Sequence, residues 1–307
     1  MTKVSKKNDV RERVSNIRFT FFGTPQLAVT VLDELERAGF LPDLVITTPD
    51  ERKGRGLKLS PPPVKEWALS HKIEVRQPKK LTLDTLKDTG GWDVFVVVAY
   101  GKILPKEVLE APRHGVLNVH PSLLPRLRGA SPIKSAILND EKKTGVSILL
   151  LDEEMDHGPI VAQKPLSSPP AGGWPPRASE LEGVLMHEAG KLLARIVPLW
   201  VSGEIEAREQ NHDLATYCEK IEKEDGLLNL SADGYKNLLK IKAYEGWPGT
   251  YAFFERSGKK IRVQILDAHL DPSTSLGASK LVIDKVQPEG KRGMDYEEFL
   301  RSGVRLL

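Results

Sequence analysis

Three polar side chains beside apolar runs carry the chemistry that this sequence suggests. Asn118 and His120 alternate with the apolar residues of the run 116–119, so both side chains leave an extended strand on the same side. Asp156 follows a second apolar run, residues 146–151, and lies 36 residues beyond His120. Prolines and a glycine break the chain after His120, as at the carboxyl edge of an open α/β sheet, where ligands bind. We therefore expect an amide, an imidazole and a carboxylate to converge at two strand ends.

This set of groups suits the transfer of an acyl group to an amine. The Asn118 amide can donate a hydrogen bond to the oxyanion that develops in such a reaction. His120 can donate to the same oxyanion or carry a proton, and Asp156 can orient the imidazole or accept the proton that the attacking nitrogen loses. Each residue alone is more often a turn residue or an ordinary polar group, so the hypothesis depends on the three together.

Composition places the chain in a reducing compartment. Its 307 residues suffice for one large domain or two ordinary ones, and only 6% are aromatic, so we expect an aliphatic core. Cys218 is the only cysteine, which excludes an intrachain disulfide. No apolar run approaches the roughly 18 residues that span a bilayer, and residues 1–16 are too polar for a secretory signal. We expect a cytoplasmic protein without a membrane segment.

Positive charge is concentrated at the two ends of the chain. The net charge is +3, and residues 1–16 carry five basic and two acidic side chains. Residues 235–307 carry thirteen basic and nine acidic side chains, so the stretch between is acidic in sum. A basic C-terminal module attached to an acidic catalytic one favours a polyanionic substrate held at two points.

Apolar patterns predict an α/β architecture up to residue 201. Strands that alternate with helices indicate a parallel, doubly wound sheet. The turn after the first strand holds one glycine, Gly23, where a dinucleotide-binding fingerprint needs three, so we expect no dinucleotide. The expected strands are residues 17–23, 44–46, 94–98, 116–119 and 146–151, and the expected helices are residues 25–39, 64–71 and 178–201.

The rest of the chain shows other patterns. Residues 49–63 and 167–176 are rich in proline and glycine, which predicts loops, and residues 203–225 are polar with little periodicity, which is typical of a linker. Short strand-like runs then predict a small β-barrel. These runs are residues 251–254, 261–266 and 281–286.

Longer motifs resemble those of the folate-dependent formyltransferase superfamily. They are NVHPSLLPRLRGASP at residues 118–132, AYGKILP at residues 99–105 and MDHGPI at residues 155–160. More narrowly, GTPQLAVTVL near the start and TTPDERKGRGLKLSPPPVK at residues 47–65 look like the methionyl-tRNA formyltransferases. The resemblance covers most of the chain from Ile17 onwards. It implies a Rossmann-like doubly wound parallel sheet with a smaller C-terminal OB-like β-barrel domain that helps to hold tRNA.

The resemblance also implies a reaction and roles for residues. The reaction is transfer of a formyl group from 10-formyltetrahydrofolate to the amino group of methionyl initiator tRNA, in translation initiation. The catalytic residues are Asn118, His120 and Asp156, and no metal is expected, because no cluster of His, Cys, Asp and Glu has ligand spacing. The implied folate-binding residues are Tyr100, Gly101, Ile103, Ser122, Leu123, Leu124 and Pro125; the implied tRNA-binding residues are Arg52, Lys53, Arg55 and Lys58.

The resulting domain division is a polar extension (1–16), a formyltransferase catalytic domain (17–205), a linker (206–225) and a C-terminal tRNA-binding domain (226–307). Two features depart from the family pattern. The stretch 266–287 looks one or two strands short, and His157 stands where the family more often has threonine. An amino-sugar-nucleotide N-formyltransferase or a formyltetrahydrofolate hydrolase would share the catalytic trio, and the basic stretch 49–59 favours tRNA over both. A non-catalytic RNA-binding protein is the alternative from another class, and the intact trio argues against it.

Overall fold

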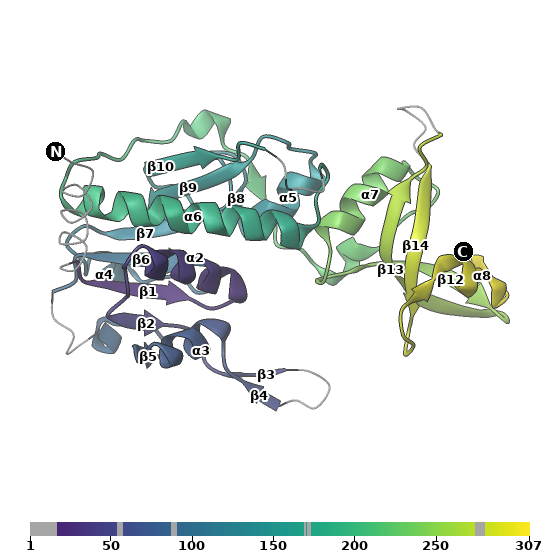
Figure 1. The fold of residues 1–307 in the computed structure, drawn as a ribbon, viewed down its shortest axis with the longest axis horizontal. Helices are drawn as coiled ribbons and strands as arrows, with labels where there is room; N and C mark the ends of the chain where they lie inside the picture. The colour runs from purple at the N-terminus through teal and green to yellow at the C-terminus, as the bar shows by residue number, and fades with distance from the viewer. Residues whose placement is uncertain (1–16, 54–57, 87–90, 169, 171–172, 274–279) are drawn as a thin grey trace, which may run out of the picture. The chain divides into compact units, whose positions relative to one another are not determined.

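The computed structural model describes residues 17–53, 58–86, 91–168, 170, 173–273 and 280–307, so the N-terminal extension lies outside the described residues. The chain divides into two compact units (Figure 1). The first unit contains residues up to 128, residues 144–166 and residues 182–217. The second contains residues 129–143, 167–181 and 218–307.

A seven-stranded sheet with the order β10-β9-β7-β6-β1-β2-β5 forms the centre of the first unit. Five of these strands, β5, β2, β1, β6 and β7, pair in parallel. Every residue of β6 is buried, as its run of four valines and a phenylalanine predicts for a strand covered on both faces. The strand bounds are β1 Phe19–Gly23, β2 Leu44–Ile46, β5 Glu74–Arg76, β6 Val94–Val98, β7 Val116–His120, β9 Gly145–Leu150 and β10 Ile160–Pro165.

Two strands differ from the expected parallel sheet. β9 runs antiparallel to β7, with Asn118 opposite Leu149, and β10 runs antiparallel to β9. The connection between Leu150 and Ile160 is too short for the crossover of about 10–12 residues that a parallel pair needs. A buried apolar run reads alike in both directions, so the sequence pattern could not show this. The parallel-dominated α/β sheet is confirmed, but the expectation of a fully parallel sheet is wrong at this edge.

Helices cover the sheet of the first unit (Figure 1). α6 passes close to α2 at Gly190, where an added Cβ would lie 2.5 Å from the Cβ of Glu34. An apolar cluster under the helices includes the rings of Phe22, Phe95 and Tyr100. The helix bounds are α2 Gln26–Arg37, α3 Pro63–Ser70, α4 Lys106–Leu109 and α6 Ala178–Val201, which begins in the second unit, with short 3₁₀ helices at η1 Leu83–Leu86 and η2 His212–Leu214. Among the described helices, none has the length and apolar character that a membrane crossing takes.

The stretch 49–63, expected to be a loop, contains a hairpin. β3 (Glu51–Lys53) pairs antiparallel with β4 (Lys58–Ser60). The described side chains of this hairpin are exposed or half-buried. A hairpin without a buried face has no apolar alternation, so its strands were invisible to pattern reading.

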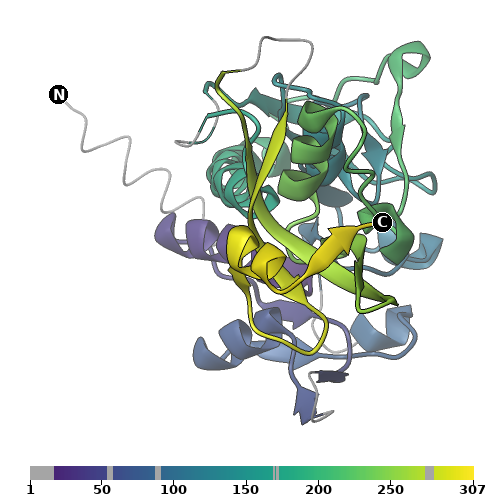
Figure 2. The same ribbon diagram turned by 90° about the vertical axis from the view of Figure 1, so that its right-hand side faces the viewer.

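The second unit is built on an antiparallel sheet with the order β15-β14-β13-β12-β16. Within the described residues this order has two open ends, so the sheet is a half-barrel, and its core includes Phe254 and Phe299. Figure 2 shows β13 and β14 twisting past α8 near the C-terminus. The bounds are β12 Thr250–Arg256, β13 Lys259–Leu270, β14 Leu281–Pro288, β15 Met294–Asp295, β16 Val304–Leu306, α5 Pro132–Leu138, α7 Gly234–Ala243, α8 Tyr296–Arg301 and η3 Lys223–Gly226. The short strands β8 (Arg128–Gly129) and β11 (Tyr217–Cys218) lie where the chain passes between the units.

The stretch that looks short in the sequence joins two long strands. β13 and β14 pair from Val263 opposite Pro288 to Leu270 opposite Leu281. The register shifts on both sides of Asp267, and such irregularities bend a sheet. The described part of residues 266–287 therefore belongs mainly to the end of β13 and to most of β14.

Candidate active site

Three side chains expected to do chemistry meet on one face of β7. Asn118 lies in the middle of β7 and His120 at its end, so the alternation of a strand turns both side chains to the same side. Asn118 Nδ2 lies 3.4 Å from Asp156 Oδ1, and His120 Nδ1 lies 3.5 Å from the same oxygen. His120 is 4% exposed and Asp156 is 9% exposed. The expected convergence of the three groups is confirmed.

The second nitrogen of His120 fixes the state of the ring. His120 Nε2 lies 2.8 Å from the carbonyl oxygen of Leu127. A carbonyl only accepts, so Nε2 carries the hydrogen, and a neutral ring would turn the lone pair of Nδ1 toward the Asp156 carboxylate. The contact is attractive only when one proton lies on Nδ1 or on the carboxylate. The structure therefore places Nδ1 and the carboxylate where one proton can lie between them.

Asp156 reaches the trio through a loop rather than from a strand end. Because β9 is antiparallel to β7, the end of β9 at Leu150 lies near the start of β7. The chain then makes an excursion and returns, with the amide of Leu150 donating to the carbonyl of Pro159 at 2.9 Å. Asp156 sits in this loop with a φ of +51°, a left-handed conformation that is uncommon for a residue other than glycine. Asp156 was expected at the end of a strand; it lies instead within the loop that joins the end of β9 to β10.

A tight turn, residues 122–125, follows His120 and is held by side chains from neighbouring strands. Ser147 Oγ accepts from the amide of Leu124 at 3.0 Å and donates to the carbonyl of Ser122 at 2.6 Å. Gln163 Nε2 donates to the carbonyl of Leu124 at 2.8 Å. Ser147 and Gln163 were not found from the sequence, where Ser147 is hidden inside an apolar run.

The apolar members of this turn have different surroundings. Leu124 is 4% exposed and packs with Leu149 and Ile160 in a small apolar cluster. Leu123 and Pro125 are half-buried. Ser122 is buried, and its hydroxyl donates to the carbonyl of Arg126 at 2.6 Å. The half-buried Leu123 and Pro125 are therefore the members of the turn with side-chain surface to offer a ligand.

The second expected wall of the folate site follows β6. Tyr100 is 1% exposed, its ring lies edge-on to Phe22 at 5.6 Å, and burial raises the pKa of its hydroxyl to about 12. Gly101 is exposed with a φ of +81°, which glycine adopts without strain. Ile103 is 91% exposed. In this structure, then, the loop offers an isoleucine side chain and glycine backbone at the surface, and the tyrosine belongs to the core.

Two buried residues support the Asp156 loop and were missed in the sequence. The Gln210 side chain donates to the carbonyls of Asp156 and Gly158, and Arg128 donates to Gln210. Arg128 lies inside the recognised motif, but nothing in the residues around it indicates a buried supporting role. Gln210 lies in the stretch expected to be a linker. These contacts join segments that are far apart in the sequence.

Comparison with known proteins identifies the family. A family model described as Formyl transferase matches residues 15–168. A methionyl-tRNA formyltransferase of Chloroflexus aurantiacus is 38% identical over 302 residues, covering 92% of this chain and 96% of that protein. One of Thermotoga maritima is 41% identical over 299 residues, covering 92% and 94%. The chain belongs to the formyl transferase family. The resemblance drawn from the sequence motifs is confirmed.

Solved structures agree on the fold of this formyl transferase. A methionyl-tRNA formyltransferase from Clostridium thermocellum aligns with a TM-score of 0.56 and 17% identity, covering 89% of this chain and 98% of that one. A sugar 3N-formyl transferase determined in the presence of dTDP and 5-N-formyl-THF aligns with a TM-score of 0.64 and 17% identity, covering 90% and 99%. At such identities the likeness shows the fold alone.

Three of the four residues expected to hold tRNA lie on the β3–β4 hairpin. Arg52 and Lys58 are exposed, Lys53 forms the end of β3, and Arg55 lies outside the described residues. The base of the hairpin is anchored by Asp50, whose carboxylate accepts from Lys65 at 2.8 Å and from Gln77 at 2.7 Å.

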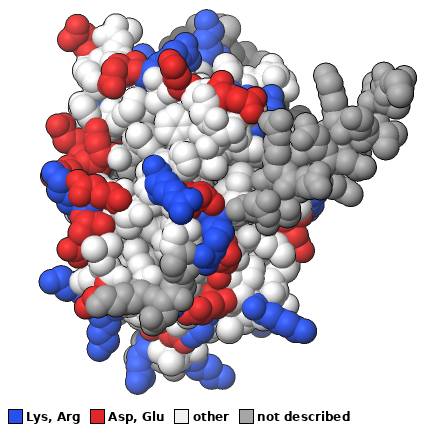
Figure 3. Space-filling model, turned by 90° about the vertical axis from the view of Figure 1, so that its left-hand side faces the viewer, with Lys and Arg blue, Asp and Glu red and all other residues white. Residues whose placement is uncertain are grey.

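Figure 3 shows one face of the formyl transferase on which Lys and Arg are interspersed with Asp and Glu. On that face, binding of a polyanion would depend on local clusters of cations rather than on a broad field.

His157, the departure from the family pattern, turns to other partners. Its Nδ1 lies 2.7 Å from Asp152 Oδ2, and its ring stacks on His212 at 4.2 Å with an angle of 10°. His157 thus packs against η2 beside the buried network.

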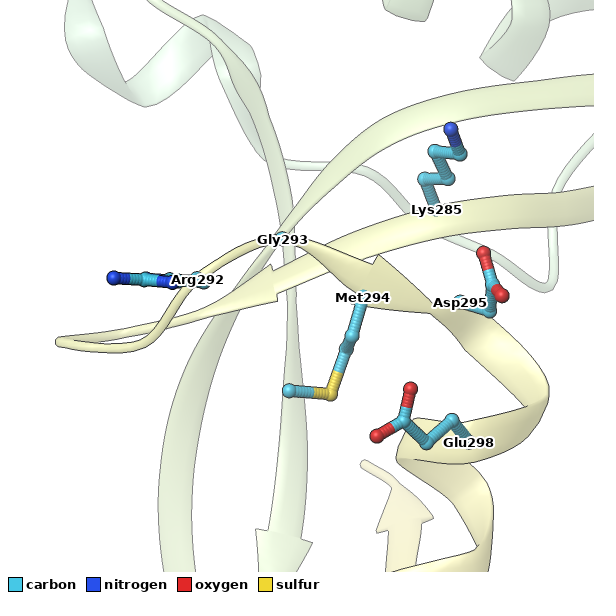
Figure 4. Close-up of a pocket in the computed structure, with 6 residues that line it drawn as sticks. All are labelled: Lys285, Arg292, Gly293, Met294, Asp295 and Glu298. Atoms are coloured by element: carbon cyan, nitrogen blue, oxygen red, sulfur yellow. The ribbon is translucent and has the colours of Figure 1, made fainter.

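A hollow of about 580 Å³ lies in the second unit (Figure 4). Its lining residues are far along the chain from the predicted catalytic residues. Its lining mixes two cations with two carboxylates around a methionine. The lining residues are Lys285, Arg292, Gly293, Met294, Asp295 and Glu298. Among the described residues, no group of three or more His, Cys, Asp or Glu side chains is arranged to hold a metal ion.

Proposed function

We propose that this formyl transferase moves a formyl group from 10-formyltetrahydrofolate to the amino group of methionyl initiator tRNA, in translation initiation in the cytoplasm. The observation that carries the reaction is the meeting of Asn118 and His120 at one oxygen of Asp156. The acceptor is supported by the printed names of relatives that are 38% and 41% identical over nine-tenths of the chain. Structures of family members with 5-N-formyl-THF or folinic acid support a reduced folate as the donor.

The proposed catalytic cycle uses each member of the trio. The neutral amine attacks the formyl carbon, and a carbon–nitrogen bond forms while the carbonyl oxygen becomes an oxyanion. Asn118 Nδ2 has two N–H groups, of which one faces Asp156 and the other can donate to the oxyanion. The His120–Asp156 pair takes the proton that the amine loses. Protonated His120 Nδ1 can then donate to the oxyanion, and the proton finally passes to the folate nitrogen as its bond to carbon breaks.

We assign binding roles to the two loops and the hairpin. Ser122, Leu123, Leu124 and Pro125, together with Tyr100, Gly101 and Ile103, hold the folate, and Leu123, Pro125 and Ile103 have exposed or half-buried side chains with which to do so. Arg52, Lys53, Arg55 and Lys58 contact the phosphates of tRNA. We assign catalysis to residues 17–205 and a second tRNA contact to residues 226–307, with residues 206–225 between them.

A direct assay tests the function. The purified protein is given 10-formyltetrahydrofolate with methionyl initiator tRNA, with an amino-sugar nucleotide, or with water alone, and the formylated product or released formate is measured. We expect formyl-methionyl-tRNA as the main product, and no product from Asp156→Asn above about 1% of the wild-type rate. Faster formylation of the sugar, or release of formate alone, would identify one of the alternative activities. No turnover with any acceptor would favour a non-catalytic protein.

A further inference from the structure

Gln210 holds the loop that carries Asp156. Its side chain is 5% exposed, and its Nε2 donates to the carbonyl of Asp156 at 2.8 Å and to the carbonyl of Gly158 at 2.7 Å. The two carbonyls stand on either side of His157. One amide group therefore uses both of its N–H donors on the short turn that carries the carboxylate.

Arg128 fixes the direction in which the Gln210 amide faces. Arg128 is 2% exposed, and its Nη2 and Nε lie 2.7 Å and 3.2 Å from Gln210 Oε1. A guanidinium only donates hydrogen bonds, so only the oxygen of the amide can face it. The nitrogen must then face the two carbonyls. Two hydrogen bonds from one guanidinium to the same oxygen set the geometry more firmly than a single hydrogen bond.

Two features of the Asp156 loop show why it needs this support. A left-handed backbone at a residue other than glycine is strained and persists only when its surroundings hold it. Asp156 has a φ of +51°. The contacts of Asp156 Oδ1 with Asn118 and His120 are already long, at 3.4 and 3.5 Å. A small movement of the loop would break both contacts.

We propose that Gln210 is a positioning residue for the transfer reaction, with Arg128 as the group that orients it. Gln210 holds the backbone on both sides of His157, so that the Asp156 carboxylate meets Asn118 and His120 at once. Neither Gln210 nor Arg128 needs to touch substrate in this role. The inference rests on the proposed function in so far as Asp156 is the proton-accepting group.

The variant Gln210→Glu separates positioning from folding. The new carboxylate keeps the volume of the side chain and can pair with Arg128, so the fold is retained. It has no N–H group for the carbonyls of Asp156 and Gly158 and repels both. We expect kcat to fall about 100-fold, because a displacement on the order of 1 Å at reacting groups has a cost of that size. The KM values for the folate and for tRNA should change less than about threefold, because binding groups are untouched.

Two further variants complete the experiment. Gln210→Ala should lower kcat to a similar extent and also lower the unfolding temperature, because buried Arg128 loses one of its acceptors. Trp200→Phe is a matched control: it removes an N–H that donates to the carbonyl of His114 at 2.8 Å, on a part of α6 with no assigned role. It should lower stability and leave kcat unchanged.

The outcomes are distinct. A kcat within about threefold of wild type for a folded Gln210→Glu protein would overturn the proposal, because positioning within about 1 Å would then not matter. A raised KM with an unchanged kcat would overturn it as well, since Gln210 would then shape a binding site. If the wild type ignores methionyl-tRNA but formylates another amine, the proposed function fails, and the same comparison made with that amine still decides the role of Gln210.

Discussion

A single methyl group added at Gly158 should displace the Asp156 loop and slow the reaction. Gly158 lies two residues after Asp156, and a Cβ built on it would lie 1.9 Å from the carbonyl oxygen of Leu150. A Cβ atom essentially never comes within 3.0 Å of such an atom, so this contact must open by at least 1.1 Å. Both sides of the contact are backbone, at the point where the loop leaves and rejoins the sheet, so no flexible side chain can absorb the change.

The size of the effect follows from that distance. Misplacement of a catalytic group by about 1 Å costs on the order of 100-fold in rate, which corresponds to about 2.7 kcal/mol in activation free energy. Overpacking should also lower the free energy of unfolding by about 1–3 kcal/mol. We therefore expect Gly158→Ala to fold, with kcat about 100-fold lower and with KM values near those of wild type.

The assay is steady-state formylation of charged tRNA, together with thermal unfolding. Gly183→Ala is the matched control, because Gly183 lies in α6 and an added Cβ would meet no atom of the described residues within 4 Å, apart from its chain neighbours and the adjacent helix backbone. Alanine there should stabilise the protein by about 0.5–1 kcal/mol and leave kcat unchanged. If Gly158→Ala kept its kcat while losing stability, the placement of the loop would not control the reaction and the reasoning would be refuted.

Asp156→Asn, which keeps the size of the side chain but cannot accept the proton, should lower kcat by about 10² to 10⁴ with an unfolding temperature close to wild type, and a near-normal rate would exclude the assigned role. Arg52→Ala and Lys58→Ala should each raise the KM for tRNA and reduce its salt dependence, measured between low and moderate salt, whereas KM for the folate should not move. Tyr100→Phe removes a buried hydroxyl that has no hydrogen-bond partner among the described residues, so stability should be kept or raised; a higher KM for the folate would show that the hydroxyl contacts the ligand. Hydrogen bonds, first from Lys65 and then from Gln77, hold the pKa of Asp50 below its usual 3.8. The stability that Asp50 contributes is therefore complete above pH 3.8 and is lost as the pH falls through the lower pKa of the folded state. In denaturant, Asp50→Asn should be less stable than wild type at pH 7, and the difference should shrink in acid.

The elements whose residue pattern is local could be predicted from the sequence alone. Residues 94–98 and 178–201 form β6 and α6 with the expected bounds, because a β-branched run and a long helical periodicity need no partner to be read. The side on which Asn118 and His120 leave β7 also follows from the alternation of a strand alone. The motifs around these residues were enough to recognise the family.

The way in which Asp156 reaches its partners depends on contacts between distant segments of the chain. The direction of β9 and β10 depends on strand pairing and on the length of the connection, and neither is encoded in the apolar pattern of a strand. The loop that returns Asp156 to β7 is held by Gln210, 54 residues away, and Gln210 is oriented by Arg128, 82 residues away. The hydrogen-bond partners of a buried amide or guanidinium are the groups that the fold brings within reach. Residue type and spacing along the chain do not specify these partners.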